Sequence, residues 1–191
     1  MEVMAITITL IVLLIIGAAV FLWFQSTQRK LVDLDEKCKN AFSQIEVQLN
    51  SRWDALLSLA KAAMAYAKHE GETLIKVIEG RRGIEVRTVA DVNEQQDAYN
   101  DVLSRLMAVR EAYPDLKASG LFERTMDSIQ EYEENVRMAR MVYNDTATRM
   151  NRYVRQWPSN IVAQRLGFNV QEYLKADNKQ KKDMPDLFTA E

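Results

Sequence analysis

The hydrophobic pattern opens with a long uncharged segment. Residues 3–28 carry no charge, and only two threonines and a glycine interrupt the apolar run from Ala5 to Phe24. About 20 apolar residues in a helix cross the ~30 Å hydrocarbon layer of a bilayer, and Trp23 lies where aromatic side chains favour the headgroup zone. A cleaved signal peptide would need a basic start, a shorter apolar run and a small-residue cleavage site. This chain starts Met-Glu and its run ends Phe-Leu-Trp-Phe, so we expect residues 3–28 to cross the lipid bilayer once.

The pattern after residue 30 predicts a long amphipathic helix. Between Leu31 and Ala67 apolar residues recur at a mean interval of about 3.6 residues, the period of an α-helix. Neither glycine nor proline lies between Gly17 and Gly71, so the membrane segment and this helix should form one continuous helix. The pattern breaks at Gly71, and a short helical stretch follows at residues 72–79.

Two further long helices are expected. Residues 91–113 show helical spacing with Asp91 as a candidate N-cap, and this helix should stop before Pro114, because the residue preceding a proline avoids α conformation. Residues 121–156 carry an apolar row at seven-residue intervals, which is typical of long side-by-side packing of helices. A short amphipathic piece follows at residues 159–168. The row comprises Phe122, Ile129, Val136, Tyr143, Met150 and Trp157.

These elements predict an all-α protein, in which an N-terminal transmembrane helix continues into an antiparallel bundle of three to four long helices. The expected parts are a membrane anchor at residues 1–28, a helical-bundle domain at residues 29–174 and a charged, flexible tail at residues 175–191. The pattern leaves the path of residues 80–91 open.

If three main helices run up, down and up from the membrane, the two ends of the bundle can be assigned. The membrane-distal surface should then contain Tyr66, His69, Glu70, Trp157 and Asn160. The membrane-proximal turn should contain Tyr113, Pro114, Lys117 and Arg124.

Polar residues also lie in register beside the apolar rows. Gln44, Gln48 and Arg52 recur every four residues in the first helix and drift toward the edge of its buried face by about 40° per step. Glu133 and Arg140 lie one heptad apart in the last long helix. One interpretation is a hydrogen-bond and ion-pair network inside the bundle, since half-buried charges need partners. The alternative is a polar groove that binds a partner's peptide.

Charge and composition narrow the possible partners. The chain has 25 Lys and Arg against 27 Asp and Glu, a net charge of −2, and no basic stripe with interleaved aromatics, so we expect no nucleic-acid partner. Arg29 and Lys30 follow the membrane segment and no cation precedes it, which favours a cytoplasmic side for the C-terminal domain. The single cysteine, Cys38, cannot form an internal disulfide and falls on an apolar row, as a small buried hydrophobe does.

The sequence has too few histidines and cysteines for the common catalytic and metal-binding motifs. His69 is the only histidine, which excludes the paired Glu-x-x-His di-iron pattern and the two-histidine zinc-protease motif. Cys38 and His69 would lie about 46 Å apart on one helix, beyond reach of a nucleophile–base pair. We therefore expect no catalytic residue, no cofactor, no metal site and no enzymatic activity.

Several blocks in order along the chain resemble the LemA family. These blocks are 41-AFSQIEVQL-49, Arg52 with Asp54, 66-YAKHE-70, 72-ETL-74, 113-YPDLKA-118, Ala139-Arg140, Tyr143-Asn144, Asn151, Pro158, Asn160 and Gly167-Phe168. The resemblance implies a single-pass membrane protein with a bundle of long helices and no established enzymatic activity. A relative in magnetotactic bacteria, linked to formation of the magnetosome membrane, implies a membrane-organising role. Residues 56-LLSL-59 stand where the family usually has Ile-Pro-Asn-Leu, so no proline kink is expected there, and 133-EEN-135 replaces the usual Glu-Asn-Arg.

The combined expectation is a non-enzymatic scaffold or adaptor in the bacterial inner membrane, with its N-terminus outside and its C-terminal domain in the cytoplasm. Its partner would be an unidentified membrane or cytoplasmic protein, or further copies of the chain, since confinement to a surface raises local concentration. The alternative is a module that binds a lipid headgroup or peptide at the membrane surface, near the turn at residues 113–118.

Overall fold

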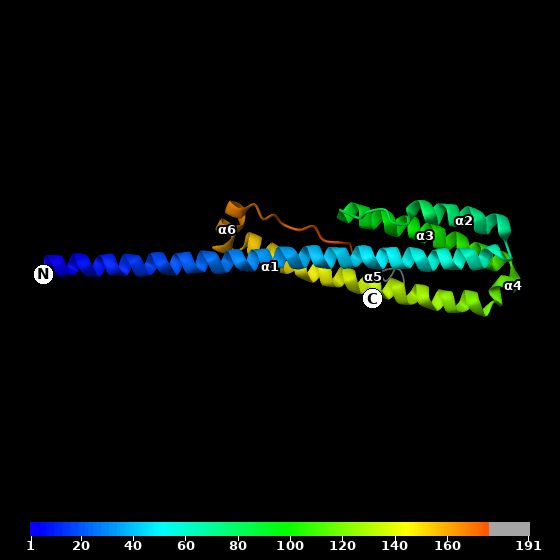
Figure 1. Cartoon of the computed structure of the whole chain (residues 1–191), viewed down its shortest axis with the longest axis horizontal. Helices are drawn as coiled ribbons and strands as arrows, with labels where there is room; N and C mark the ends of the chain where they lie inside the picture. Colours follow the sequence, from blue (N-terminus) through cyan, green and yellow to red (C-terminus); the bar gives the residue numbers. More distant parts are fainter. Residues whose placement is uncertain (176–191) are drawn as a thin grey trace, which may run out of the picture. The chain divides into compact units, whose positions relative to one another are not determined.

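The computed structural model describes residues 1–175, and all regular secondary structure in this range is helical (Figure 1). The chain passes through α1 (Glu2–Met64), α2 (Lys68–Arg81), α3 (Val89–Ala112), α4 (Pro114–Lys117), α5 (Gly120–Arg155) and α6 (Ser159–Leu166). α1 continues through residues 56–59 without a break, as expected where the family's proline is absent. The all-α class and the helical-bundle arrangement are confirmed. The expected charged tail lies outside the described residues from residue 176 onward.

Two compact units divide the chain. The anchor unit comprises residues 1–40 and 145–172, and the bundle unit comprises residues 41–144 with the described residues from 173 onward. α1 and α5 each contribute residues to both units. The boundary expected after residue 28, between membrane anchor and bundle domain, concerns the membrane and stays a prediction.

The anchor unit begins with a fully exposed apolar helix. Every residue from 1 to 23 is exposed, and within the described range α1 is the helix that is long and apolar enough to cross a membrane, with none of its apolar stretch buried. A core helix of a globular domain buries such side chains, whereas a lipid-crossing helix turns them toward acyl chains. The exposure therefore supports a membrane anchor.

A small apolar core closes the anchor unit beyond this span. It contains Leu31, Leu34 and Cys38 of α1, Met150 of α5, and Val162 and Ala163 of α6. α6 ends at Gly167, whose φ of 77° is a left-handed cap. The expectation for Cys38 is confirmed, since its side chain is buried and burial, followed by the charge of Asp35, raises the pKa of its thiol.

After α6 the chain returns along α5, held by two asparagine side chains. In the anchor unit, Asn151 donates from Nδ2 to the carbonyl of Gln171 over 2.9 Å and accepts from the Gln171 N–H over 2.6 Å. In the bundle unit, Asn144 makes the same pair of bonds with Leu174, both 2.9 Å.

The directions of the bundle helices follow from contacts at their ends. Arg82 at the end of α2 forms an ion pair with Asp54, while Gly71 near its start lies against Met64, so α2 is antiparallel to α1. α3 starts beside Arg52, which bonds Gln96, and ends where the Tyr113 hydroxyl bonds Glu70; α3 is therefore parallel to α1. α5 is antiparallel, because it brings Glu133 to Arg52 and Tyr143 to Phe42. The buried core includes Trp53, Leu56, Leu59, Ala63, Leu74, Ile78, Tyr99, Leu106, Phe122 and Ile129.

Gly71 lies inside α2 rather than in a break. It is buried, and a Cβ built on it would lie 2.6 Å from Cα of Met64, so the absence of a side chain lets α2 pack closely on the end of α1. The sequence pattern misses this role because a glycine usually weakens a helix. α2 is thus a full descending helix, and the expected up, down, up path has one helix too few.

The start of α3 differs from the expected N-cap at Asp91. Thr88 is the N-cap, and its hydroxyl accepts from the Asp91 N–H over 3.1 Å. The Asp91 carboxylate reaches back to the N–H groups of Thr88 and Arg87, over 2.8 and 2.9 Å. This is a capping box with Asp91 at its third helical position. Gly83, with φ of 73°, precedes it in the loop that connects α2 to α3.

Candidate functional site: a buried polar cluster around Arg52

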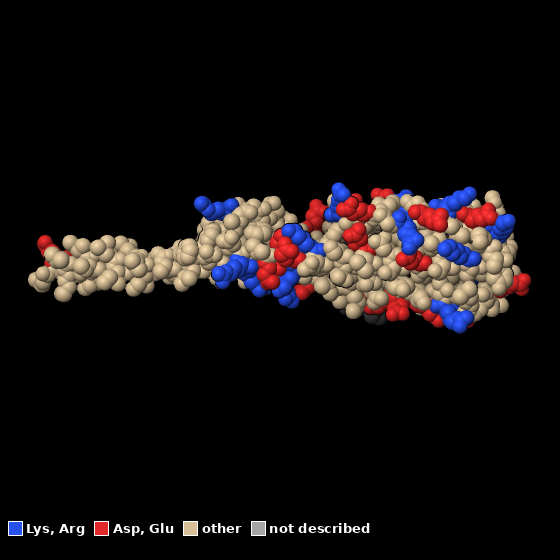
Figure 2. All heavy atoms as spheres, viewed as in Figure 1, with Lys and Arg blue, Asp and Glu red and all other residues tan. Residues whose placement is uncertain are grey.

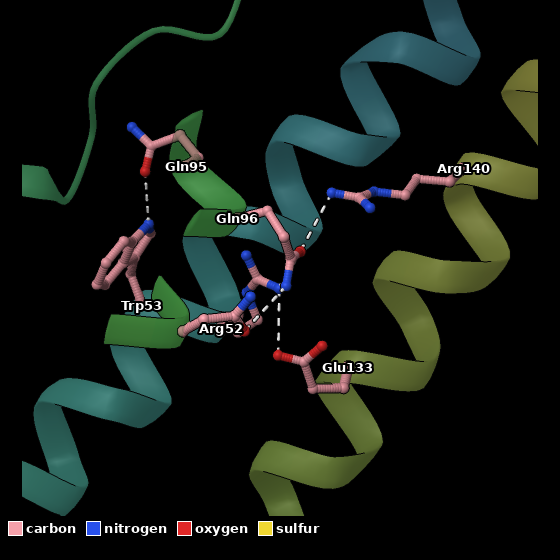
Figure 3. A network of polar contacts seen from close by, with 7 residues as sticks. Arg52, Trp53, Gln95, Gln96, Glu133 and Arg140 are labelled. Carbon is pink, nitrogen blue, oxygen red and sulfur yellow. Dashed lines mark hydrogen bonds and ion pairs between the residues drawn. The ribbon is translucent and has the colours of Figure 1, made fainter. Parts of the chain in front are cut away.

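Arg52 is a buried cation of the bundle unit, with no exposed surface. Its Nη1 donates to Oε1 of Gln96 over 2.8 Å and to Oε1 of Glu133 over 3.2 Å. Arg140 donates from Nη2 to the same Gln96 oxygen over 3.1 Å. Figure 3 shows these side chains converging from α1, α3 and α5, so one cluster holds three helices in register.

Aromatic rings complete the cluster. The guanidinium of Arg52 lies 3.9 Å from the ring centroid of Tyr99, a cation–π contact. Trp53 packs edge-on against the same ring, with 5.4 Å between centroids, and its Nε1 donates to Gln95 over 2.9 Å (Figure 3). Consecutive residues of α1 thus bond consecutive residues of α3, which fixes both the rotation and the height of one helix against the other.

The electrostatics of the cluster suit structure rather than proton transfer. Burial lowers the pKa of Arg52, and the nearby Glu133 carboxylate opposes this shift. Burial raises the pKa of Tyr99 above its usual range, although Arg52 acts in the opposite direction. Within residues 1–175, Nε and Nη2 of Arg52 and the Tyr99 hydroxyl have no hydrogen-bond partner. A tyrosine with a raised pKa and an arginine are poor bases and nucleophiles at neutral pH, so these two buried side chains are suited to structural contacts.

Part of the residue set expected from the sequence meets here. Arg52, Glu133 and Arg140 are brought together, whereas Gln44 is exposed and Gln48 is half-buried outside the cluster. The drift of about 40° every four residues explains this difference, because it moves the earlier glutamines toward the solvent side of α1.

Sequence reasoning missed the α3 side of the cluster. The apolar row of α3 that ends at Leu106 continues backward in helical spacing through Tyr99 to Gln96, Gln95 and Val92, all of them buried. The available signal was a glutamine at a core position of one helix, together with an arginine at a core position of a neighbouring helix. Because glutamine usually marks an exposed face, the sequence pattern alone does not predict that the row continues to Gln95 and Gln96.

The expected distal and proximal groupings are wrong in part. Tyr113, expected near the membrane, donates its hydroxyl to Glu70 over 3.1 Å, which was expected at the far end. Trp157, expected at the far end, lines a hollow with Trp23 and Arg29 next to the membrane segment. The cause is α2, which adds one passage and reverses the direction of α3 and α5.

The other residues of these groupings have local roles. Tyr66 and His69 are exposed at the connection between α1 and α2, and Asn160 is half-buried in α6. Pro114 opens α4, and Lys117 forms an ion pair of 2.8 Å with Glu111. Arg124 donates to the Gly120 carbonyl over 3.1 Å and lines a shallow hollow between α1 and α5. Over residues 1–175 there is no group of three potential metal ligands.

Comparison with known proteins gives a family and several relatives. The model of the LemA family matches residues 41–187. A protein named LemA from Metamycoplasma hominis is 29% identical over 157 residues, covering 81% of this chain and 71% of the relative. Two proteins of Paramagnetospirillum magneticum, named magnetosome proteins MamQ 1 and MamQ 2, are each 34% identical over 77 residues, or 40% of this chain. The match spans only 28% of the length of these two relatives.

Proposed function

The chain belongs to the LemA family, and from this premise we propose that it is a non-enzymatic, membrane-anchored scaffold or adaptor. It presents a helical bundle at the membrane for interaction with a partner protein or with further copies of itself. Its relatives named as magnetosome proteins support a role in organising a cellular structure.

One observation carries this proposal: α1 supplies both the exposed apolar span and part of the bundle core. Residues 1–23 are exposed and apolar in the main, while Trp53 and Leu56 of the same helix are almost fully buried. A membrane that binds the first part of α1 therefore holds the bundle through a covalently continuous helix. Such a continuous helix keeps a binding surface of the bundle at the bilayer.

The charge distribution supports the bacterial inner membrane with the bundle in the cytoplasm. The positive-inside rule counts Lys and Arg close to the span. Arg29 and Lys30 follow the span directly, and residues 150–171, also in the anchor unit, add Arg152, Arg155 and Arg165 without any carboxylate. These cations favour a topology with the N-terminus outside.

The cluster around Arg52 supports an interaction role for the outer surface. Arg52 makes its polar contacts inside the bundle unit, which favours the internal network over the peptide groove. Exposed apolar side chains are available elsewhere in this unit, such as Tyr66 at 45% and Met138 at 53% exposed. Apolar surface of this kind is common at sites of protein association.

Photo-crosslinking in native membranes tests the proposal. A photoreactive phenylalanine replaces Tyr66 or Met138 in the full-length chain, and Leu13 in the span serves as the matched control. We expect protein adducts from the bundle positions and lipid adducts alone from residue 13. An adduct of twice the chain's mass identifies self-association, and any other protein adduct identifies a partner.

The absence of protein adducts at both bundle positions in intact membranes would contradict the scaffold.

Thiol labelling tests the topology separately. With Cys38 changed to Ala, Lys68→Cys should resist a membrane-impermeant thiol reagent in intact cells and react in inverted vesicles. Labelling in intact cells would reverse the orientation.

A further inference from the structure

The anchor unit contains a hollow of about 580 Å³ where α1 leaves its apolar stretch, within the ~300–1,000 Å³ of small-molecule sites. α1 contributes Trp23, Ser26, Arg29 and Lys30, and the corner between α5 and α6 contributes Trp157 and Ser159. The hollow therefore combines two indole rings, hydroxyl groups and two cations on one surface.

The height of the hollow along α1 matches the headgroup layer. Trp23 is the last residue but one of the apolar run, and Arg29 lies six residues later, about 9 Å along the helix axis. The polar layer of each leaflet is roughly 5–8 Å thick, and tryptophan favours its inner edge. With residues 3–28 in the bilayer, as proposed above, the indole of Trp23 lies at glycerol level and the two cations at phosphate level.

Cations outnumber carboxylates around the hollow, which has Asp33 as its acidic lining residue. Residues 3–32 and 150–171 contain the cations Arg29, Lys30, Arg152, Arg155 and Arg165 and no carboxylate. Figure 2 shows a long uncharged part of α1 after the charged N-terminal end. On the face shown, the first charged side chains that follow this uncharged part are those of Lys and Arg. Both segments belong to the anchor unit, so its fold gathers cations at the membrane exit.

The acidic residue that lines the hollow is already engaged. Asp33 pairs with Lys37 at 3.0 Å and with Lys30 at 3.6 Å, and the hydrogen bond from Lys37 lowers the pKa of the Asp33 carboxyl. Arg29 makes no hydrogen bond or ion pair within the described part of the chain and is exposed. An arginine without a protein partner beside a second cation is suited to a phosphate group.

Exposed apolar side chains surround the same corner. Trp157 is 76% exposed and Ile161, one turn later in α6, is 56% exposed, while Val162 and Ala163 are buried. A short helix with one apolar face on the protein and further apolar side chains outside is suited to the boundary between headgroups and acyl chains. The corner would then cover the hollow's outer rim with lipid rather than water.

We propose that this hollow binds an anionic phospholipid of the leaflet from which α1 emerges. Arg29 and Lys30 hold its phosphate, and Trp23 and Trp157 lie against its glycerol and upper acyl region. Bound lipid would fix the height and tilt of the bundle above the membrane. The inference rests on the membrane crossing in the proposed function but needs no protein partner.

Native mass spectrometry of the full-length protein in detergent tests the site, with phosphatidylglycerol or phosphatidylcholine as the added lipid. We expect phosphatidylglycerol to bind at least tenfold more tightly than phosphatidylcholine. The variant Arg29→Gln with Lys30→Gln should lose most of this preference, since each cation near an anionic lipid contributes roughly fivefold. The matched control, Lys39→Gln with Arg149→Gln, removes two cations of the same unit that lie outside the hollow and pair with their own carboxylates, and should keep the preference.

Equal binding of the two lipids, or equal losses in both double variants, would overturn the site. Displacement of the lipid by millimolar inorganic phosphate would also overturn it, because it would assign the hollow to soluble anions. Alkaline carbonate extraction separates this result from failure of the membrane anchor. We expect the Arg29 and Lys30 variant to stay in the membrane, so that only the lipid preference changes.

Discussion

The two units of the chain align their helices through different kinds of contact. The bundle unit buries a cation, with Arg52 bonded to Gln96 and Glu133 and stacked on Tyr99. The anchor unit has a core of apolar side chains, Cys38 and Met150 among them, and its arginines and lysines lie at the surface. Directional bonds define one alignment of three helices, whereas an apolar core tolerates sliding. The comparison suggests that precise register is needed in the bundle and charge display at the membrane exit.

The loss of stability on removal of one partner of an ion pair should differ most between the two units. Glu133→Ala leaves the buried cation of Arg52 without its carboxylate, and we expect the free energy of unfolding to fall by about 3 kcal/mol. In the anchor unit, Asp145→Ala breaks the exposed pair with Arg149 and should cost less than ~1 kcal/mol. Denaturant titration of the full-length protein in micelles, followed by circular dichroism, measures both.

The double variant Arg52→Met with Glu133→Ala sharpens this test. It removes the buried charge together with its partner, so most of the lost stability should return. A loss as large as that of Glu133→Ala alone would mean that packing around Glu133, rather than the unpaired cation, causes the effect. An unchanged stability of Arg52→Met with lost partner crosslinks would instead favour the peptide groove.

Close packing within the bundle unit gives the next largest effect. In Gly71→Ala the new Cβ would meet the backbone of Met64 at 2.6 Å, so α2 must move away from α1 at a cost of about 1–3 kcal/mol. Gly80 lies in the same helix with open space around its Cβ position. Gly80→Ala should therefore stabilise the protein by ~0.5–1 kcal/mol. Equal effects of the two changes on the denaturation midpoint would show that the contact at Gly71 is unimportant.

The same glycine marks the limit of what the sequence predicts. The continuity of α1 was predictable because no glycine or proline interrupts residues 18–70, and α5 because its heptad row is regular. Gly71 resembled a helix end, and only a neighbour that lies close by in space, Met64, gives it a different meaning. The short stretch expected at residues 72–79 is part of a longer helix, α2 (Lys68–Arg81), and this added passage through the bundle reverses its expected ends.

The candidate site shows the same limit at the level of side chains. Arg52, Glu133 and Arg140 could be predicted because each lies beside an apolar row on its own helix. Gln96 joins them only because α3 runs parallel to α1 and its third turn lies at the height of Arg52. Helix direction is set by contacts between segments far apart in the chain, and a local pattern does not contain it.

The two asparagine clamps allow a local comparison of the units. Asn151→Leu removes both bonds to Gln171 in the anchor unit, and Asn144→Leu removes both bonds to Leu174 in the bundle unit. We expect each change to cost about 1–2 kcal/mol and to speed hydrogen exchange of its own partner amide by at least tenfold. Faster exchange of both amides in each variant would show that the returning segment is released as one piece.

The smallest expected effect is a pH dependence at the start of α3. Hydrogen bonds from the N–H groups of Arg87 and Thr88 lower the pKa of Asp91. A carboxyl whose pKa is lower in the folded state stabilises that state above its unfolded pKa of about 3.9, and the stabilisation is lost as the pH falls through the folded value. The anchor unit's Asp33 also has a lowered pKa, with the bond from Lys37 as the main cause. It lies within the continuous α1, however, where no helix end depends on it.

Acidification from pH 5 to pH 2 should therefore shift the amide resonances of Thr88 and Asp91 toward coil values, while those near Asp33 stay helical. Asp91→Asn keeps an acceptor oxygen without a titrating group, so its capping should be independent of pH in this range. If fraying at Thr88 is as steep in the asparagine variant as in the natural chain, the capping box is not the acid-sensitive element. The first loss would then belong to another carboxylate of the bundle unit, with Glu133 beside Arg52 as the next position to change.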